Sequence, residues 1–266
     1  MSNYKKDILD LNYCLYSSLA SSVLFRDECV IALNPQNPVH QQSNLCFRIR
    51  LSNEKDLGSF IDETAAAFKT VSCQPRYHVD ELSTPSLERI CTEFLRLGYK
   101  NIDIDTDLIM SWELQGPVLN NHDGCCRKAT INDLDCMTRV FSASFGYDDS
   151  NWLRYKLKTQ LLMSDTFQLF VTEDQGVIAS VVILHMPLGL PHLGHVNSVA
   201  THPDYQRKGM ASVCLSYALQ RTCKAGQKFY LETYDDLYHA HRMYEKVGFK
   251  HEGLLKSSMI AFSDNK

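Results

Sequence analysis

The chain has 266 residues, of which 44% are hydrophobic and 22% are charged, and its formal net charge is −4. This length suits one large or two small domains, and the acidic balance points to neither a nucleic acid nor a membrane as a partner. No apolar run approaches the roughly 18–20 residues of a membrane helix, and the N-terminus lacks a signal-peptide core. The ten cysteines are scattered without a CxxC pair, which favours buried thiols, no metal site and a cytoplasmic location.

The first part of the chain alternates between patterns typical of helices and of strands. Apolar residues at helical spacing predict a helix over residues 4–20. Runs of β-branched and aromatic residues predict strands at 22–33, 45–51, 76–80 and 108–114. Two further helices are expected at residues 52–68 and 83–98, the second with Pro85 near its first position.

A cluster of turn-forming residues separates the two parts of the chain. Gly116–Pro117 is followed by Asn120, Asn121, Asp123 and Gly124, and such clusters are typical of loops. We therefore expect a first domain over residues 1–116, a linker over 117–124 and a second domain over 125–266.

The second part reads as a more regular α/β succession. We expect a strand at 125–128, then a helix capped by Thr130 and Asp133, then another helix from Ser150 or Asn151 to residue 162. A hairpin over residues 166–184 and a central strand at 195–200 follow. After these come a helix from Met210 to just before Gly226, a strand at 229–233 and a last helix that ends near Gly248.

The segment QRKGMA, residues 206–211, lies between the central strand and the next helix. A helix start leaves about four backbone N–H groups without partners and carries roughly half a positive charge. Gly209 and Ala211 allow an anion to approach this backbone closely. The segment therefore predicts a phosphate-binding loop, although it is neither a P-loop nor a dinucleotide-binding motif.

Two motifs together resemble one enzyme family. Gln206-x-x-Gly209-x-Ala211 is similar to the Q/R-x-x-G-x-G/A loop that binds the acyl-CoA pyrophosphate in the GNAT N-acetyltransferases. AHRMYEKVGFK, residues 240–250, resembles the A-x-x-x-Y-x-k-x-G-F signature of the same family. The resemblance covers residues 125–254 and implies an α/β fold whose mixed central sheet, flanked by helices, is splayed between the fourth and fifth strands.

The resemblance also implies how acetyl-CoA, the co-substrate, is bound. It assigns the pantetheine arm to backbone groups of Val199, Ala200 and Thr201. It assigns the pyrophosphate to the loop made of Gln206, Arg207, Lys208, Gly209, Met210, Ala211 and Ser212. Leu237 stands where the family usually has an asparagine, so Asp235 or Asp236 is an alternative helix cap.

Three residues are candidates for proton transfer. Tyr244 occupies the position of the family's general acid, and a tyrosine with a pKa near 10 suits the protonation of a thiolate. Asn197 occupies the usual position of the base and cannot accept a proton. His195, on the same strand face as Asn197, and Glu232, on the next strand, are the remaining candidates for the base. His185 and His192 are expected at the surface.

Residues 85–100 echo residues 237–250 at an offset of 150 residues. Gly98 then matches Gly248, Phe94 matches Tyr244 and Tyr99 matches Phe249. One interpretation is a degenerate first copy of the same fold, without the phosphate loop and the tyrosine; the other is an unrelated helical cap. In both, the first half does not bind CoA but packs beside the second half and shapes the acceptor pocket.

The predicted function is transfer of an acetyl group from acetyl-CoA to a primary amine, by direct attack in a ternary complex. Two alternatives stay open: a CoA-binding regulatory module without turnover, and a protein lysine or N-terminal acetyltransferase whose first half recruits the partner. The identity of the amine is not predicted, and both a monomer and a homodimer are compatible with the sequence.

Overall fold

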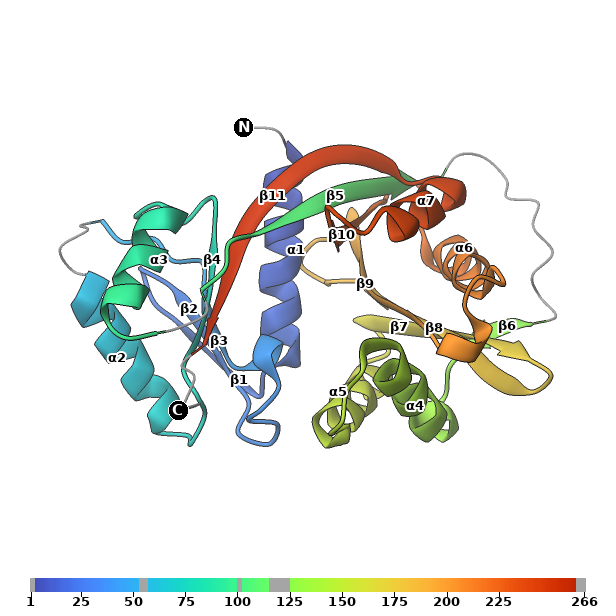
Figure 1. Ribbon diagram of the computed structural model, residues 1–266, viewed down its shortest axis with the longest axis horizontal. Coiled ribbons are helices and arrows are strands. Elements are labelled where there is room, and N and C mark those ends of the chain that lie inside the picture. Colours follow the sequence, from blue (N-terminus) through green and yellow to red (C-terminus); the bar gives the residue numbers. More distant parts are fainter. Residues whose placement is uncertain (1–2, 53–56, 100–101, 115–124, 262–266) are drawn as a thin grey trace. The chain divides into compact units, whose positions relative to one another are not determined.

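The computed structural model describes residues 3–52, 57–99, 102–114 and 125–261 (Figure 1). The chain divides into two compact units. Unit 1 comprises Met1–Leu11 and Ile109–Gly253, and unit 2 comprises Asn12–Leu108 and Leu254–Lys266. Helix α1 (Asn3–Leu19) and strands β5 (Asp105–Glu113) and β11 (Lys250–Ala261) therefore contribute residues to both units. The expected linker, residues 117–124, lies outside the described residues.

Unit 2 is built on strands β1 (Ser22–Phe25), β2 (Val30–Leu33), β3 (Leu45–Phe47) and β4 (Arg76–Asp80), in that order, followed by the end of β11. The first three strands are antiparallel, β3 and β4 are parallel, and β11 is antiparallel to β4. Helices α2 (Leu57–Lys69) and α3 (Leu87–Arg96) follow β3 and β4 in the chain. The single strand expected at 22–33 is thus a hairpin.

The core of unit 2 is aromatic. Tyr77 on β4 is fully buried, and its ring centroid lies 4.6 Å from that of Phe94 on α3. Phe94 in turn packs edge-on against Tyr99, at 4.8 Å. The residue that matches Tyr244 in the internal echo is therefore a packing residue here.

Unit 1 carries the strand order β11-β5-β10-β9-β8-β7-β6. Its strands are β6 (Cys126–Lys128), β7 (Phe167–Asp174), β8 (Val177–His185), β9 (Leu193–Thr201) and β10 (Lys228–Tyr234), with the ends of β5 and β11. Neighbouring strands from β6 to β9 are antiparallel, and β9 and β10 are parallel. This mixed sheet agrees with the expected fold class.

Four helices accompany this sheet: α4 (Leu134–Phe145), α5 (Asn151–Leu162), α6 (Met210–Thr222) and α7 (Tyr238–Val247). α4 packs on β8 and β9, and α6 packs on β7 and β8 from the opposite face (Figure 1). β8 is therefore covered on both faces, and its residues Ile178–His185 are all buried. A strand covered on both faces reads as a continuous apolar run.

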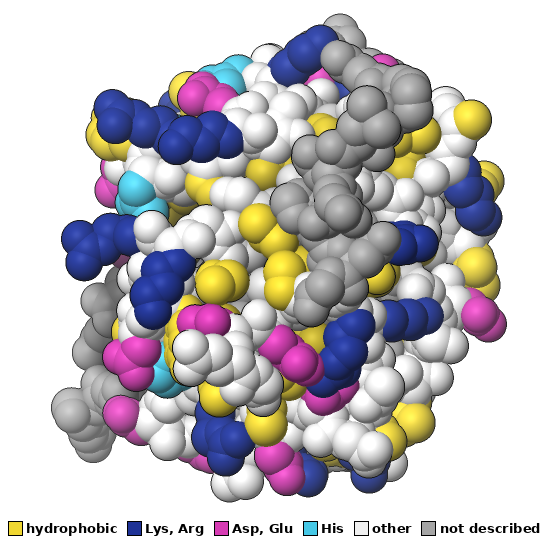
Figure 2. Space-filling model, turned by 90° about the vertical axis from the view of Figure 1, so that its right-hand side faces the viewer, with side chains coloured by type: hydrophobic (Ala, Val, Ile, Leu, Met, Phe, Trp, Pro, Cys, Tyr) yellow, Lys and Arg dark blue, Asp and Glu magenta, His cyan; other side chains and the backbone are white. Residues whose placement is uncertain are grey.

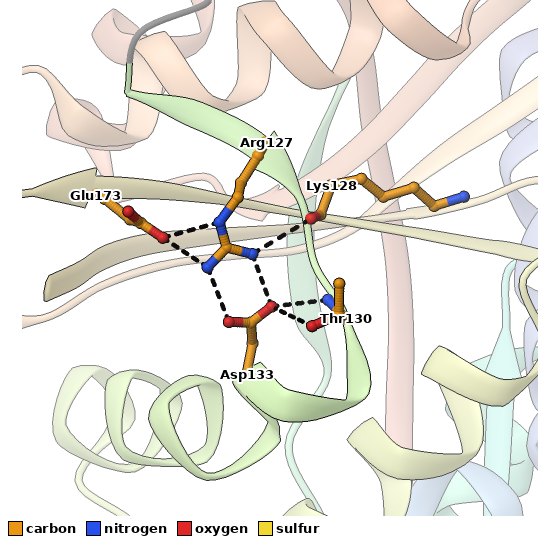
Figure 3. A network of polar contacts seen from close by, with 5 residues as sticks. All are labelled: Arg127, Lys128, Thr130, Asp133 and Glu173. Carbon is orange, nitrogen blue, oxygen red and sulfur yellow. Dashed lines mark hydrogen bonds and ion pairs between the residues drawn. The ribbon is translucent and has the colours of Figure 1, made fainter. Parts of the chain in front are cut away.

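A network centred on Arg127 ties β6 to β7 and to the start of α4 (Figure 3). The Arg127 guanidinium donates to both carboxylate oxygens of Asp133, at 2.7 and 2.8 Å, and to Glu173. Asp133 also accepts from the Thr130 backbone N–H at 2.7 Å, which completes the capping box expected there. Arg127 lowers the pKa of Asp133 to about 2, so the ion pair persists throughout the neutral range.

Candidate functional site

The centre of unit 1 is the point at which two parallel strands part. β9 and β10 pair only at Leu193 with Lys228, Gly194 with Phe229 and His195 with Tyr230. β9 continues to Thr201 in register with β8, whereas the described residues of β10 after Tyr230 have no partner on β9. Every second residue of β9 then turns its N–H and C=O toward the opening. This is the splay expected between the fourth and fifth strands of the fold.

Gly194 is required where the two strands still pair. A Cβ atom at Gly194 would lie 2.5 Å from the Phe229 ring, because that ring lies directly over the glycine backbone. The Phe229 ring is fully buried and also packs edge-on against Trp112 of β5, at 6.3 Å. The closed end of the splay is therefore a tightly packed aromatic contact.

A β-bulge lies just beyond the closed end. Leu184 of β8 pairs with Val196 and Ile183 pairs with Ser198, so Asn197 is the extra residue of β9. Bulges bend a strand and redirect side chains. The Asn197 Oδ1 atom accepts a hydrogen bond from Gln160 Nε2 of α5 at 3.1 Å. The residue in the usual position of the base is therefore fixed by a fully buried glutamine.

The other end of β9 leads into the predicted phosphate-binding loop, residues 206–212. Gln206 Nε2 donates to the Thr201 carbonyl oxygen at 3.4 Å, and Lys208 Nζ lies 4.9 Å from the centroid of the Tyr205 ring. Arg207 and Gly209 both have a left-handed backbone, with φ of 61° and 80°. Gln206, Arg207, Lys208 and Gly209 are all exposed.

Gly209 is the N-cap of α6, and no side chain caps this helix. The first helical hydrogen bond runs from the Val213 N–H to the Gly209 carbonyl, so the amides of Met210, Ala211 and Ser212 have no acceptor within the helix. A Cβ atom built at Gly209 meets nothing within 4 Å. The loop therefore offers backbone donors, two nearby cations and free space, which are the features that suit a diphosphate.

His195 and Glu232 meet at the splay. The His195 Nε2 atom lies 3.7 Å from Glu232 Oε2, with 5% and 22% of the two side chains exposed. Burial lowers the pKa of His195 to about 4, so its imidazole is neutral at pH 7. The structure thus brings the two candidate bases side by side, one of them in partial contact with solvent.

His185 extends this group to a third strand, contrary to the surface position expected for it. It pairs with His195 in the β8–β9 ladder and stacks on Phe167, with ring centroids 4.9 Å apart. Its side chain is fully buried, and neither ring nitrogen has a hydrogen-bond partner among the described residues. Burial, together with the neighbouring His195, lowers the pKa of His185 to about 3. His192 is exposed, as expected.

Tyr244 lies on α7, the helix that follows β10. Its ring packs edge-on against Phe249 at 5.8 Å, and burial raises its pKa to about 12. Leu237 is the N-cap of α7, and no side chain caps this helix, so the suggestion that Asp235 or Asp236 does so is wrong. Instead, a ring nitrogen of His241 lies 2.9 Å from the Tyr234 carbonyl oxygen.

Sequence reasoning missed Gln160 and the burial of His185. Gln160 continues the helical spacing of the apolar residues Leu153 and Leu157. This spacing is the signal that could have predicted its position on the buried face of α5. His185 directly follows eight residues of a buried strand, and the loop residues Pro187 and Gly189 obscured where that strand ends.

The described part of the chain holds no group of three or more His, Cys, Asp or Glu side chains placed to bind a metal ion. In the same ranges, no helix has the length and apolarity needed to cross a membrane. On the face seen in Figure 2, basic side chains stand among acidic and apolar ones. The charge of that face is therefore mixed.

One protein family is similar to this chain in sequence. The profile of the acetyltransferase (GNAT) family matches residues 134–249, a range that includes the splay, the phosphate-binding loop and Tyr244. A search of curated protein sequences found no match.

Solved structures share the fold over nearly the whole chain. A GCN5-related N-acetyltransferase from Kribbella flavida is 12% identical, with a TM-score of 0.65 over 99% of this chain and 96% of its own. A protein of unknown function from Staphylococcus epidermidis is 13% identical, with a TM-score of 0.67 over 91% of this chain and 94% of its own. A GCN5-related N-acetyltransferase from Sphaerobacter thermophilus is 13% identical, with a TM-score of 0.53 over 91% of this chain and 82% of its own.

At these identities the structural likeness establishes the fold, and the family profile identifies the domain. Residues 134–249 form a GNAT acetyltransferase domain, which makes the protein an acyltransferase with acetyl-CoA as co-substrate.

Proposed function

We propose that this protein transfers the acetyl group of acetyl-CoA to a primary amine, with both substrates bound at once. The observation that carries the proposal is the parting of β9 and β10 after His195 and Tyr230, at the strand that leads into the open loop before α6. An extended substrate arm fits beside β9, and its diphosphate fits the loop.

The backbone supplies most of the binding groups. The amides of Met210, Ala211 and Ser212 point out of the start of α6, where the helix dipole favours an anion. Along β9, the edge that β10 leaves unpaired near Val199 and Thr201 offers backbone groups to the amides of the pantetheine arm, whereas Ala200 between them pairs with Val181 of β8. Acetyl-CoA supplies the activated acetyl thioester, and a backbone N–H near Val199 is the proposed donor to its carbonyl oxygen.

Two side chains handle protons. Tyr244, with its pKa raised to about 12, keeps its proton at neutral pH and is suited to donate it to the departing thiolate. On the amine side we favour Glu232 over His195, because burial makes His195 a weak base. Glu232 is partly exposed to solvent water, and the neutral His195 lies beside it, with 3.7 Å between His195 Nε2 and Glu232 Oε2.

A second candidate function is CoA binding without turnover. The observation that favours it is Asn197: the amide that replaces the usual base is held in the bulge by Gln160. A regulatory module needs the phosphate-binding loop but no base. Only the acetyltransferase has an acceptor, and small amines, peptide N-termini and protein lysines are all candidates for it.

All ten cysteines are free thiols. This supports the proposal that the protein acts in a reducing compartment such as the cytoplasm.

The deciding experiment is a calorimetric titration with acetyl-CoA and with desulfo-CoA, followed by a thiol-release screen over amines and peptides. Binding of both ligands with amine-dependent thiol release supports the acetyltransferase. Binding without thiol release for any acceptor supports the regulatory module. Absence of binding contradicts both and leaves only the fold.

A further inference from the structure

A cavity of about 590 Å³ lies in unit 1, away from the splay and the phosphate-binding loop. Its floor is the sheet face formed by β6 and β7, and one wall is the C-terminal end of α6. Known small-molecule sites occupy about 300–1,000 Å³, so the volume is that of a ligand pocket.

The floor is built by strand pairing. Lys128 of β6 pairs in register with Phe170 of β7, so the two side chains share one face of the sheet. Arg127 points to the other face, and Figure 3 shows the Lys128 side chain extending away from the Arg127 network. The ammonium group of Lys128 is therefore directed to the cavity side rather than to Asp133 and Glu173.

The wall is an ordered aromatic and cationic stack. Tyr217 and Arg221 lie four residues apart on α6, and the Arg221 guanidinium lies over the Tyr217 ring, 5.2 Å from its centroid. The Phe170 ring meets the Tyr217 ring edge-on, at 5.9 Å and 76°. An apolar surface is thus already in place beside a fixed positive charge.

The charge of the cavity is opposite to that of the whole chain. Lys128, Arg221 and Lys224 contribute three positive charges against the single carboxylate of Asp165, in a protein of net charge −4. The end of α6 adds only about half a negative charge. A net positive charge of more than one unit remains, which favours an anionic ligand.

The cavity is distinct from the phosphate-binding loop, although both use α6. Ser212, in the first turn of α6, and Arg221, in the last turn, are nine positions apart, which is roughly 14 Å at 1.5 Å per residue. The cations of the loop, Arg207 and Lys208, do not line the cavity.

We propose that this cavity is a second ligand site, which takes a small organic anion with an aromatic or other apolar body. The anionic group lies among Lys128, Arg221 and Lys224, and the apolar body lies against Tyr217, whose ring is packed on the buried Phe170. Asp165 accepts a hydrogen bond from a hydroxyl or amino group of the same ligand. An inorganic anion satisfies only the first of these contacts and binds more weakly.

The probe is 8-anilinonaphthalene-1-sulfonate, a fluorescent aromatic sulfonate, titrated into the intact protein with and without excess CoA. Saturable binding that persists with CoA is expected, because CoA occupies the loop and not the cavity. The double variant Arg221→Gln, Lys224→Gln is expected to bind the probe about tenfold more weakly. Both side chains are exposed, so the variant retains the fold.

A matched double variant, Lys158→Gln with Lys250→Gln, removes two exposed positive charges of unit 1 that do not line the cavity. Its affinity for the probe is expected to stay within about twofold of the parent, since distant surface charges are screened. Equal loss in both double variants, or loss of all probe binding with CoA, overturns the proposal. Inorganic phosphate and benzenesulfonate are compared as competitors of the probe. If phosphate displaces the probe as readily as benzenesulfonate, the inference that the ligand has an apolar body is overturned.

Discussion

At the scale of single residues, Tyr244 carries the sharpest prediction. Replacing it with Phe keeps the ring that packs on Phe249 and removes only the hydroxyl. General acid catalysis typically contributes a factor of about 10²–10⁴, so we expect kcat to fall by about a hundredfold or more. The dissociation constant of acetyl-CoA, measured by calorimetry, is expected to stay within about twofold, because the proposed binding groups are backbone amides.

Tyr238→Phe is the matched control. Tyr238 begins the same helix and is largely exposed, so its hydroxyl has no proposed role and kcat should not change. Equal turnover in Tyr244→Phe and the parent protein would falsify the assignment of the acid.

The buried histidines predict a pH dependence of stability. An unfolded imidazole has a pKa near 6.5, whereas burial lowers that of His185 to about 3. Below pH 6.5 the unfolded state therefore binds more protons than the folded state. The stability from a neutral His185 is fully present above pH 6.5 and is lost as the pH falls toward 3. At pH 5 the loss is about 2 kcal/mol of unfolding free energy.

His185→Phe should reduce this loss, since a phenyl ring can stack on Phe167 and does not titrate. Urea denaturation at pH 7 and pH 5 measures the difference in unfolding free energy for each protein. His192→Gln, at an exposed histidine of the following loop, serves as the control and should behave like the parent. A parent and a His185→Phe variant with the same difference would show that His185 is not buried in the neutral form.

The sequence predicted the roles of residues that belong to a motif, but not the burial of residues whose environment depends on packing. The meeting of His195 with Glu232 follows from two strands that the sequence already placed side by side. The burial of His185 depends on Phe167, which lies 18 residues earlier and is brought into register by the hairpin. No local pattern carries that information, because the partner is set by strand pairing.

At the scale of elements, the left-handed turn before α6 gives a prediction with an internal control. Gly209 has φ of 80° and Gly226, in the turn after α6, has φ of 76°, and a Cβ atom meets nothing within 4 Å at either position. Alanine at each should therefore cost a similar backbone strain, about 1 kcal/mol of stability. Only Gly209→Ala places a methyl group at the proposed diphosphate site, so only it should weaken acetyl-CoA binding.

Thermal unfolding and calorimetry together separate the two effects. We expect Gly209→Ala and Gly226→Ala to show similar losses of Tm, and the dissociation constant of acetyl-CoA to rise by about tenfold in Gly209→Ala alone. An unchanged affinity in Gly209→Ala would mean that the diphosphate does not approach this backbone.

Most helices and strands followed from periodicity, whereas the hairpin of β1 and β2 and the extent of β11 did not. α5 and β4 have the bounds that the sequence predicted. No bounds were predicted for a strand after the last helix, and β11 extends over Lys250–Ala261, with its end paired to β4. A strand whose partner lies about 180 residues away leaves only a weak local signal.

At the scale of the whole molecule, the two units follow the same order of elements. Each has a run of antiparallel strands, then a parallel pair, β3 with β4 or β9 with β10, then a helix, α3 or α7, that leads into a long strand. In unit 1 the strand beside β10 is β5, from the first half of the sequence, and in unit 2 the strand beside β4 is β11, from the second half. This shared order supports the interpretation that the first half is a degenerate copy.

Because β5 of the first half lies beside β10, and β11 of the second half lies beside β4, we predict that the second half does not fold by itself. A fragment of residues 125–266 lacks β5, which lies between β10 and β11 in unit 1. It also lacks Asp7, whose carboxylate accepts a hydrogen bond from the buried Tyr230 hydroxyl at 2.9 Å. Its exposed strand edges would favour aggregation. We therefore expect the fragment to be insoluble, despite containing the whole range that the family profile matches.

Co-expression of residues 1–114 with residues 125–266 as two separate chains should restore a soluble complex, because both long strands are then present. Size-exclusion chromatography should show the two fragments eluting together at the mass of the intact protein, and calorimetry should show acetyl-CoA binding. A soluble fragment of residues 125–266 with cooperative thermal unfolding would contradict the prediction. In that case the order of strands would describe two domains that share an edge without depending on each other for stability.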